Sequence, residues 1–162
     1  SRFKAVDQLM ADYRLRFGAN KFPLHEALEQ ILAAMERKEP VPLLMDLTVR
    51  PQRGVVVDFF GRPLLANKGM AMLALQTEAP VLPLFLVREK RHYKIIIGPE
   101  IPLQKTGDLR RDIEENTQAY NTAIEKIARA YPEQYNWIYK RWKHRPYSIW
   151  PPKKPPVMAN SN

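Results

Sequence analysis

The chain has 162 residues, of which 45% are apolar, so it is long enough for one compact domain with a core, and wholesale disorder is excluded. It contains no cysteine, which excludes disulfides, thiol nucleophiles and thiolate metal sites. The net charge of +9 favours an anionic partner: nucleic acid, an anionic membrane surface or a phosphorylated substrate, with ordinary solubility as the alternative.

Two amphipathic helices are predicted at the start of the chain. Apolar residues recur at helical spacing from Phe3 to Phe17, and Gly18 can end that helix. A second helix is expected to open at Phe22-Pro23, because proline suits a first helical turn, and to end at Pro40. No strand precedes these helices, and no initiator methionine is present. We therefore expect a fragment, an excised domain or a processed product, whose sheet lacks its first strands.

The middle of the chain predicts strands that alternate with helices. Val41–Met45 is typical of a short buried strand ending at Asp46, and Val55–Val57 is expected to be extended. Phe59–Pro63 is expected to be a loop, and Asn67–Thr77 a helix of small and apolar residues. No apolar run approaches the roughly 20 residues of a membrane span.

Two more strands and two helices are expected downstream. Val81–Val87 predicts a second buried strand, and a charged turn then leads into a third strand at Tyr93–Ile97. Asp108 is expected to cap a long helix that ends at Tyr131-Pro132. A last short helix is expected to carry aromatic and apolar residues: Tyr135, Trp137, Ile138 and Trp142.

This order predicts an α/β fold: a partial three-layer αβα sandwich with a mixed, largely parallel sheet that lacks its N-terminal strands. Residues 1–146 are expected to form the C-terminal portion of an enzyme domain. Residues 147–162, rich in proline and lysine, are expected to form a flexible tail.

Three segments, in this order and at comparable spacing, resemble the lipid A lauroyl/myristoyl acyltransferase family. The Pro-Glu-Gln-Tyr-x-Trp run is the most specific of them. The segments are Val41–Asp46 with Gly54–Pro63, Ala79–Arg88, and Tyr131–Ile138 with Arg141, Lys143, Arg145 and Pro146.

The resemblance implies an acyl transfer at the cytoplasmic face of the bacterial inner membrane. A fatty acyl thioester on acyl carrier protein would be passed to a hydroxyl of a phosphorylated glycolipid, without a cofactor or metal. A base must take the hydroxyl proton as the oxygen attacks the thioester carbonyl. The family uses a histidine, oriented by a carboxylate five positions later.

This chain lacks that pair. The residues five positions after His25, His92 and His144 are not acidic. We therefore expect no catalytic residue in this segment, which alone is expected to be inactive. The histidine would belong to a missing N-terminal half of the same enzyme, or the chain would be a degenerate, non-catalytic homologue acting at a membrane surface.

Asp46 and Arg14 are the first two candidate substrate-binding residues. The resemblance places an aspartate near the catalytic centre at the position of Asp46, where ends of strands usually carry site residues. Leu47 replaces the glutamine that usually follows it. Arg14 matches an arginine near the active site and is suited to pair with Asp46 or with a phosphate. The alternatives are a turn-capping carboxylate for Asp46 and a solvated charge for Arg14.

Three further candidates come from the expected Phe59–Pro63 loop and the helix expected after it. Gly61 permits a close backbone approach, Arg62 is suited to meet a phosphate, and Lys68 opens a helix and is suited to face an anion. Ala66 stands where the family often has threonine.

The segment Tyr139–Arg145 alternates aromatic and basic residues. This pattern suits an anionic membrane surface, with Trp137 expected in the core and the basic residues facing outward. A nucleic-acid-binding domain is the competing hypothesis. No nucleic acid is expected as a partner, because the sequence lacks an RNA-recognition motif, a zinc-finger pattern and a convincing helix-turn-helix signature.

Overall fold

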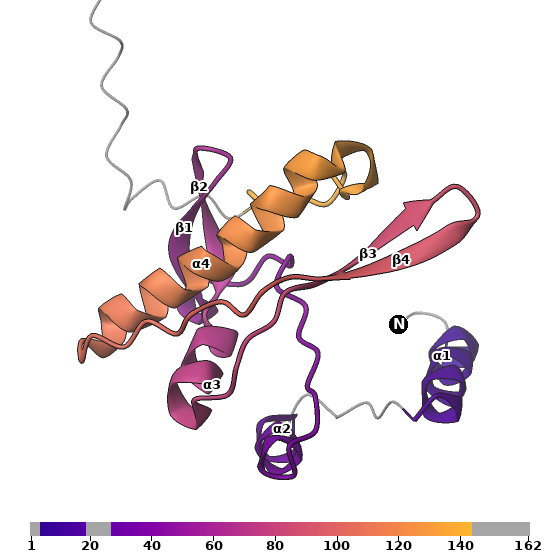
Figure 1. The fold of residues 1–162 in the computed structure, drawn as a ribbon, viewed down its shortest axis with the longest axis horizontal. Coiled ribbons are helices and arrows are strands. Elements are labelled where there is room, and N and C mark those ends of the chain that lie inside the picture. Colours follow the sequence, from indigo (N-terminus) through magenta and orange to yellow (C-terminus); the bar gives the residue numbers. More distant parts are fainter. Residues whose placement is uncertain (1–3, 19–26, 144–162) are drawn as a thin grey trace, which may run out of the picture. The chain divides into compact units, whose positions relative to one another are not determined.

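The computed structural model describes residues 4–18 and 27–143 of the chain. They fall into two compact units that divide after Pro42. Figure 1 shows the elements that the described residues form. Their order is α1 (Lys4–Arg16), α2 (Ala27–Glu36), η1 (Pro51–Arg53), β1 (Gly54–Phe59), β2 (Arg62–Asn67), α3 (Gly69–Thr77), β3 (Leu84–Glu89), β4 (His92–Ile97), α4 (Leu109–Ala130) and η2 (Pro132–Gln134).

The first unit contains the two helices that the apolar spacing predicted. Helix α1 ends at Arg16, and Gly18 follows it with a φ of 73°, a left-handed conformation that glycine adopts without strain. Helix α2 ends at Glu36, and Arg37 Nε then donates to Glu39 Oε1 over 2.7 Å. Both helices are confirmed. The expected opening of the second helix at Phe22-Pro23 lies outside the described residues.

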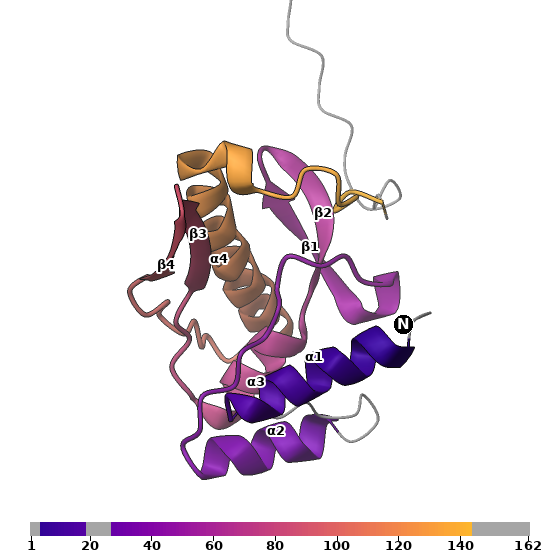
Figure 2. The same cartoon turned by 90° about the vertical axis from the view of Figure 1, so that its right-hand side faces the viewer.

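The second unit contains two antiparallel hairpins and the long helix α4, which lies between them (Figure 2). Strand β1 pairs with β2 from Gly54↔Asn67 to Phe59↔Arg62. Strand β3 pairs with β4 from Leu84↔Ile97 to Glu89↔His92. Each hairpin is closed by a two-residue turn.

The core of the second unit forms where α4 packs against the first hairpin. Phe59 and Leu64 are completely buried there. Aliphatic and aromatic residues of this core come from β1, β2, α3 and α4 and from the segment before β1: Met45, Val57, Phe59, Leu64, Ala66, Ala71, Tyr120 and Ile124.

Helix α4 begins and ends where the sequence predicts. The carboxylate of Asp108 accepts hydrogen bonds from the backbone N–H groups of Arg110 and Arg111, at 3.0 and 3.2 Å, which satisfies two donors of the first turn. The helix ends at Ala130, just before Tyr131-Pro132. Its buried face includes Asp112 and Asn116 as well as apolar residues, so it is not a purely apolar stripe.

One expected buried strand is wrong, and a second is confirmed only in part. Val41–Met45 forms no strand: Met45 is buried, but Leu44 is 75% exposed. The apolar run has no neighbouring strand among the described residues, and a strand needs a ladder partner. The second run becomes a strand only from Leu84, and its residues alternate between exposed and buried.

One strand was missed. Phe59–Pro63 is not a loop but the end of β1, a tight turn and the start of β2. Pro63 lies opposite Asp58 in the ladder, at a non-hydrogen-bonded pair next to an edge, where a missing N–H costs nothing.

The α/β class is confirmed, while the strand arrangement differs from the expected one. Both sheets of the described residues are two-stranded and antiparallel, and no parallel pair occurs among those residues. Helix α3 nevertheless connects β2 to β3, as the alternating pattern indicated.

The expected last helix is also wrong. A short 3₁₀ helix at Pro132–Gln134 is followed by turns up to Lys143. Trp137, expected in the core, is 49% exposed, and Ile138 is 91% exposed. Arg141, expected to face outward, is 2% exposed. The expected tail at residues 147–162 lies outside the described residues.

Candidate functional site

A pocket of about 280 Å³ lies in the second unit, between helix α4, strand β3 and the segment that precedes η1. Its walls are mainly aliphatic and aromatic. They include Leu43, Met45, Met70, Phe85, Ile124 and Ile127. Such walls suit an apolar ligand.

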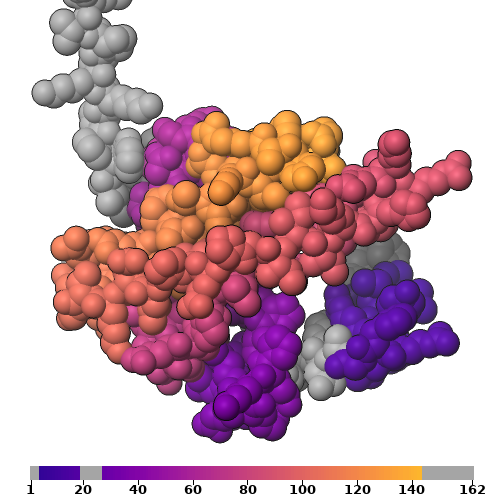
Figure 3. Space-filling model, viewed as in Figure 1, coloured from indigo at the N-terminus to yellow at the C-terminus, as the bar shows by residue number. Residues whose placement is uncertain are grey.

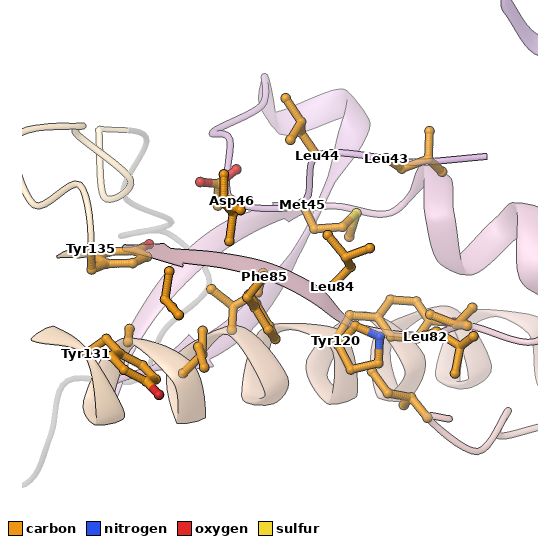
Figure 4. Close-up of a pocket in the computed structure, with 18 of the residues that line it drawn as sticks. Leu43, Leu44, Met45, Asp46, Leu82, Leu84, Phe85, Tyr120, Tyr131 and Tyr135 are labelled. Carbon is orange, nitrogen blue, oxygen red and sulfur yellow. The ribbon is translucent and has the colours of Figure 1, made fainter. Parts of the chain in front are cut away.

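The pocket has a polar end. Figure 4 shows Asp46, Tyr131 and Tyr135 at one end of the pocket and Leu82 and Tyr120 at the other. Among the described residues that line the pocket, Asp46 is the one carboxylate. A ligand with an apolar tail and a polar head matches this division.

Arg141 does not line the pocket, but its hydrogen bonds connect the residues around the polar end. Its guanidinium donates to Asn121 Oδ1 at 2.8 Å, to the Tyr135 hydroxyl at 3.3 Å and to the Met45 carbonyl at 3.4 Å. It also lies 4.4 Å from the centre of the Phe59 ring, a cation–π contact. A buried charge is costly unless it is well hydrogen-bonded, and these contacts meet that need. They join α4, the C-terminal segment and the residue before Asp46.

The Pro-Glu-Gln-Tyr run fixes the same end of the pocket to β3. The Gln134 side-chain amide accepts from Arg88 N at 2.7 Å and donates to Arg88 O at 3.1 Å, as a neighbouring strand would. Trp137 Nε1 donates to the Pro132 carbonyl at 2.6 Å, and its ring packs 4.8 Å from that of Tyr135. These contacts give the most specific sequence segment a structural role.

Asp46 is therefore placed in the candidate site, although not by the expected strand. It lies in a bend that follows extended chain, half-buried at the pocket's polar end. Next to it, Thr48 N donates to the Tyr139 hydroxyl at 3.0 Å, which ties this bend to the C-terminal segment.

Gly61 and Arg62 lie at the tip of the first hairpin and do not line the pocket. Phe60 and Gly61 both have positive φ, 57° and 69°, as a two-residue turn matched to strand twist requires. Gly61 N donates to Asp58 Oδ1 at 2.8 Å, so the glycine serves the turn. The exposed Arg62 guanidinium lies 5.5 Å from the centre of the Trp142 ring.

Lys68 lies away from the hairpin tip, and Arg14 belongs to the other compact unit. Lys68 precedes α3, at the other end of β2 from Arg62, about 17 Å along the strand at roughly 3.3 Å per residue. Arg14 lies exposed on α1, in the other compact unit, and its pairing with Asp46 stays a prediction.

Among the described residues of the pocket, the ionisable side chains are the Asp46 carboxylate and three phenols. None of its lining residues is a histidine. Burial raises the pKa of the Tyr120 phenol, and it also raises the pKa of Tyr135, where the hydrogen bond from Arg141 acts in the opposite direction. Both phenols are therefore neutral near pH 7. His92 is exposed at the start of β4, while His25 and His144 lie outside the described residues.

Two further features, a metal-ligand group and a membrane-spanning helix, are absent from the described residues. No group of three His, Asp or Glu side chains in residues 4–18 and 27–143 lies where it could hold a metal ion. None of the helices in those ranges is long and apolar enough to cross a membrane.

Sequence reasoning missed the residues that build the polar end. Gln134 stood in a matched segment without a role, Arg141 was expected to face outward to a membrane surface, and Asn121 was not singled out. The available signal was the segment Tyr131–Arg141, which follows the capped helix and is rich in side chains that can form hydrogen bonds. Their targets are 20 to 96 positions away along the chain, and no local pattern encodes such distances.

Comparisons with known proteins agree with this picture. Residues 1–144 match the family of bacterial lipid A biosynthesis acyltransferases. A lipid A biosynthesis acyltransferase of Haemophilus influenzae is 30% identical over 135 residues, which cover 82% of this chain and 41% of that protein. A lipid A biosynthesis lauroyltransferase of Escherichia coli is 31% identical over 150 residues, covering 89% of this chain and 46% of the enzyme.

The name of a third relative refers to a different lipid. The phosphatidylinositol mannoside acyltransferase of Mycobacterium tuberculosis is 28% identical over 142 residues, 86% of this chain and 43% of that protein. The chain thus spans less than half the length of each of these relatives. It belongs to the bacterial lipid A biosynthesis acyltransferase family.

Proposed function

We propose that this chain forms the C-terminal portion of an enzyme that transfers a fatty acyl chain from acyl carrier protein to a hydroxyl of a phosphorylated glycolipid, a lipid A precursor in lipopolysaccharide biosynthesis. The observation that carries the proposal is the pocket with an apolar interior and a polar end at Asp46. The acyl chain would lie along the aliphatic walls, with the reacting thioester at the polar end. The names of the relatives support the enzyme class.

The reaction needs two proton transfers and the exchange of a carbon–sulfur bond for a carbon–oxygen bond. A base takes the proton of the acceptor hydroxyl, whose oxygen forms an ester bond with the thioester carbonyl carbon. The carbon–sulfur bond then breaks, and the proton passes to the departing carrier thiol. We assign the base to a histidine in the missing N-terminal half, because the family uses a histidine and none of the described residues that line the pocket is one. This segment alone is then inactive.

The candidate side chains would bind the polar parts of the substrates. Asp46 would orient the acceptor or the histidine at the end of the pocket. Arg14, Arg62 and Lys68 would meet phosphate groups, Arg62 at the start of β2 and Lys68 just after its end. Gly61 would contribute by setting the turn that presents Arg62.

An anionic membrane surface would bring the enzyme to its acceptor at the cytoplasmic face of the inner membrane. Lys140 and Lys143 are exposed beside the exposed side chains of Trp137 and Ile138. Aromatic and aliphatic groups suit the headgroup boundary, and lysines are attracted to anionic lipid. The attachment is proposed as peripheral, or as anchored by a segment outside this chain.

Reconstitution tests the catalytic proposal. The part of the Haemophilus influenzae relative that precedes the matched region is joined to this chain, and acyl transfer from acyl carrier protein to a lipid A precursor is measured. We expect turnover by the fused protein and none by the chain alone. Turnover by the chain alone would place a base inside it. A folded fusion that binds anionic liposomes without turnover would instead identify a non-catalytic homologue.

A pocket variant tests where the acyl chain lies. Leu82→Trp, at the end of the pocket opposite Asp46, shortens the space for the tail. In the fused enzyme we expect transfer of the longest acyl chain accepted to fall at least tenfold relative to a chain four carbons shorter. Leu109→Trp is the control, because Leu109 is exposed and does not line the pocket. An unchanged chain-length preference in Leu82→Trp contradicts the assignment.

A further inference from the structure

The β3–β4 hairpin has one face that is exposed and, apart from Arg88 opposite Tyr93, apolar. Because side chains alternate along a strand and Leu84 pairs with Ile97 and Leu86 with Ile95, these residues and Tyr93 lie on the same face. Their side chains are between 60% and 69% exposed. We call Leu84, Leu86, Tyr93, Ile95 and Ile97 the outer hairpin face. Figure 3 shows the hairpin projecting from the surface of the second unit.

The same residues carry unpaired backbone groups. In an antiparallel pair, residues alternate between hydrogen-bonded and non-hydrogen-bonded pairs, and the latter point their N–H and C=O outward. Gly98 N donates to Pro83 O at 2.9 Å, which fixes this alternation and turns the backbone of Tyr93, Ile95 and Ile97 outward. In the described part of the chain, no strand pairs with this edge of β4.

An edge that is both open and apolar needs a specific kind of cover. Water satisfies the backbone groups but leaves five large apolar side chains exposed, and such an edge invites aggregation. A bilayer would cover the side chains but not the backbone, because open sheet edges are not tolerated in the hydrocarbon region. A polypeptide that adds a strand and an apolar layer satisfies both requirements.

We infer that the outer hairpin face and the free edge of β4 dock the N-terminal half of the acyltransferase. This inference rests on the proposed function and names the partner surface for the missing half. The matched relatives extend well beyond the matched region, which covers 41% and 46% of their lengths, so they contain enough chain for further strands and a covering layer. The apolar residues on both faces of β3 are typical of strands that are covered on both sides.

Docking on this face would also complete the candidate pocket. Leu84 and Leu86 belong to the outer hairpin face and line the pocket as well. A polypeptide seated there would therefore limit the access of solvent to the acyl-binding walls. The half that carries the proposed histidine would then be positioned next to those walls.

Hydrogen exchange tests the docking without relying on activity. The complete chain is mixed with the part of the Haemophilus influenzae relative that precedes the matched region, supplied as a separate polypeptide, and in parallel with vesicles containing phosphatidylglycerol. We expect the amides of Tyr93, Ile95 and Ile97 to exchange at least tenfold more slowly with the polypeptide, and unchanged with the vesicles. Protection by vesicles alone, or by neither partner, overturns the inference.

Three variants separate the face from the edge. Ile95→Asp places a charge on the face, and Ile95→Pro removes an outward N–H that the hairpin itself does not use, which edge strands tolerate. Each is expected to weaken binding of the polypeptide at least tenfold. Leu109→Asp, at a leucine that is 64% exposed outside the hairpin, is expected to bind normally. Circular dichroism checks that the variants are folded.

Two outcomes distinguish this inference from the proposed function. Turnover by the fused enzyme with equal activity in Ile95→Asp and Ile95→Pro would overturn the docking surface and leave the acyltransferase proposal intact. Normal docking without turnover would overturn the acyltransferase proposal and leave the docking surface intact. Self-association of the chain through Ile95 that persists with the polypeptide present would assign the face to a second copy and overturn the inference.

Discussion

The two hairpins of the second unit are built alike and buried differently. Each has two six-residue strands and a two-residue turn. The first hairpin contains Phe59 and Leu64, which are completely buried. In the second hairpin, Val87 is the one buried residue among those described. The strands are thus equivalent in backbone and differ in what covers them.

The two hairpins also share a pair of side-chain hydrogen bonds. In the first hairpin, the Gln118 side-chain amide accepts from Asp58 N at 2.7 Å and donates to Asp58 O at 3.0 Å. In the second, Gln134 makes the same pair of bonds to Arg88. Asp58 and Arg88 each lie one residue before the end of their first strand. One outward-facing site of each hairpin is therefore closed by an amide from or just after α4.

The difference lies in the layer that α4 provides. At the turn of the first hairpin, Glu125 Oε2 accepts from Phe60 N at 2.7 Å, and the Arg129 guanidinium lies 4.5 Å from the centre of the Phe60 ring. At the turn of the second hairpin, Lys90 and Arg91 are both exposed. Turn residues and ladders thus suffice to make a hairpin, whereas burial requires a packed element from elsewhere.

The largest expected effect comes from removing the centre of the covered hairpin. Phe59→Ala should lower the free energy of unfolding by about 3–5 kcal/mol, because it removes a completely buried ring. Ile95→Ala, on the outer hairpin face, should change it by less than about 0.5 kcal/mol in the chain alone. Urea unfolding followed by tryptophan fluorescence measures both. Equal losses would mean that the second hairpin is already covered in solution.

The next effect concerns the junction between the covered hairpin and the candidate site. Arg141→Ala should lower the free energy of unfolding by about 2–3 kcal/mol, since it breaks hydrogen bonds from a charged group and leaves Asn121 Oδ1 without that donor. Lys140→Ala is the matched control at an exposed neighbour and should have almost no effect. A loss as small as that of the control would show that the buried guanidinium contributes no stability. The same urea titration serves for both variants.

Acid should weaken the N-terminal end of α4 through Asp112. Its carboxylate accepts from Thr106 Oγ1 at 2.6 Å and Thr106 N at 2.8 Å, and these bonds hold the pKa of Asp112 below its usual value. Because the pKa is lower in the folded state, this stabilisation is complete above about pH 4 and is lost as the pH falls through the folded value. Thermal unfolding from pH 6 to pH 2 should show a shallower decline in Asp112→Asn.

A second carboxylate variant makes the acid experiment specific. Glu100 is exposed, and Glu100→Gln should leave the decline in unfolding temperature as it is in the unmodified chain. If Asp112→Asn and the unmodified chain lose stability in parallel between pH 4 and pH 2, the Thr106 contacts do not stabilise the ionised carboxylate.

The elements that the sequence predicted correctly are those with local causes. Asp108 caps α4 through N–H groups two and three residues away, and Gly18 and Tyr131-Pro132 mark helix ends that a short window contains. The turn at Glu89–Arg91 and the strand that follows it were equally local. For the same reason, the class of the fold could be predicted from the alternation of its elements.

The site depends on contacts that no short window contains. Asp46 was predicted at the site from its resemblance, but as the end of a strand that does not form. Arg141 was expected to face outward because its sequence neighbours are basic, and it is buried because Asn121 and Met45 lie against it. Asn116 is buried because Gln104 pairs with its amide, at 2.9 Å and 2.8 Å. Hydrophobic periodicity ignores such polar partners.

The smallest expected effects compare the two turns. Gly61 has a φ of 69°, so Gly61→Ala should cost about 1 kcal/mol of stability, the cost of a left-handed alanine. Lys90 has a φ of 54° without being glycine, so Lys90→Gly should instead raise the free energy of unfolding by about 0.5 kcal/mol. If the urea midpoint responds to Gly61→Ala and not to Lys90→Gly, the second hairpin opens separately from the core. In that case the midpoint should respond to Lys90→Gly once the N-terminal half is docked on the outer hairpin face.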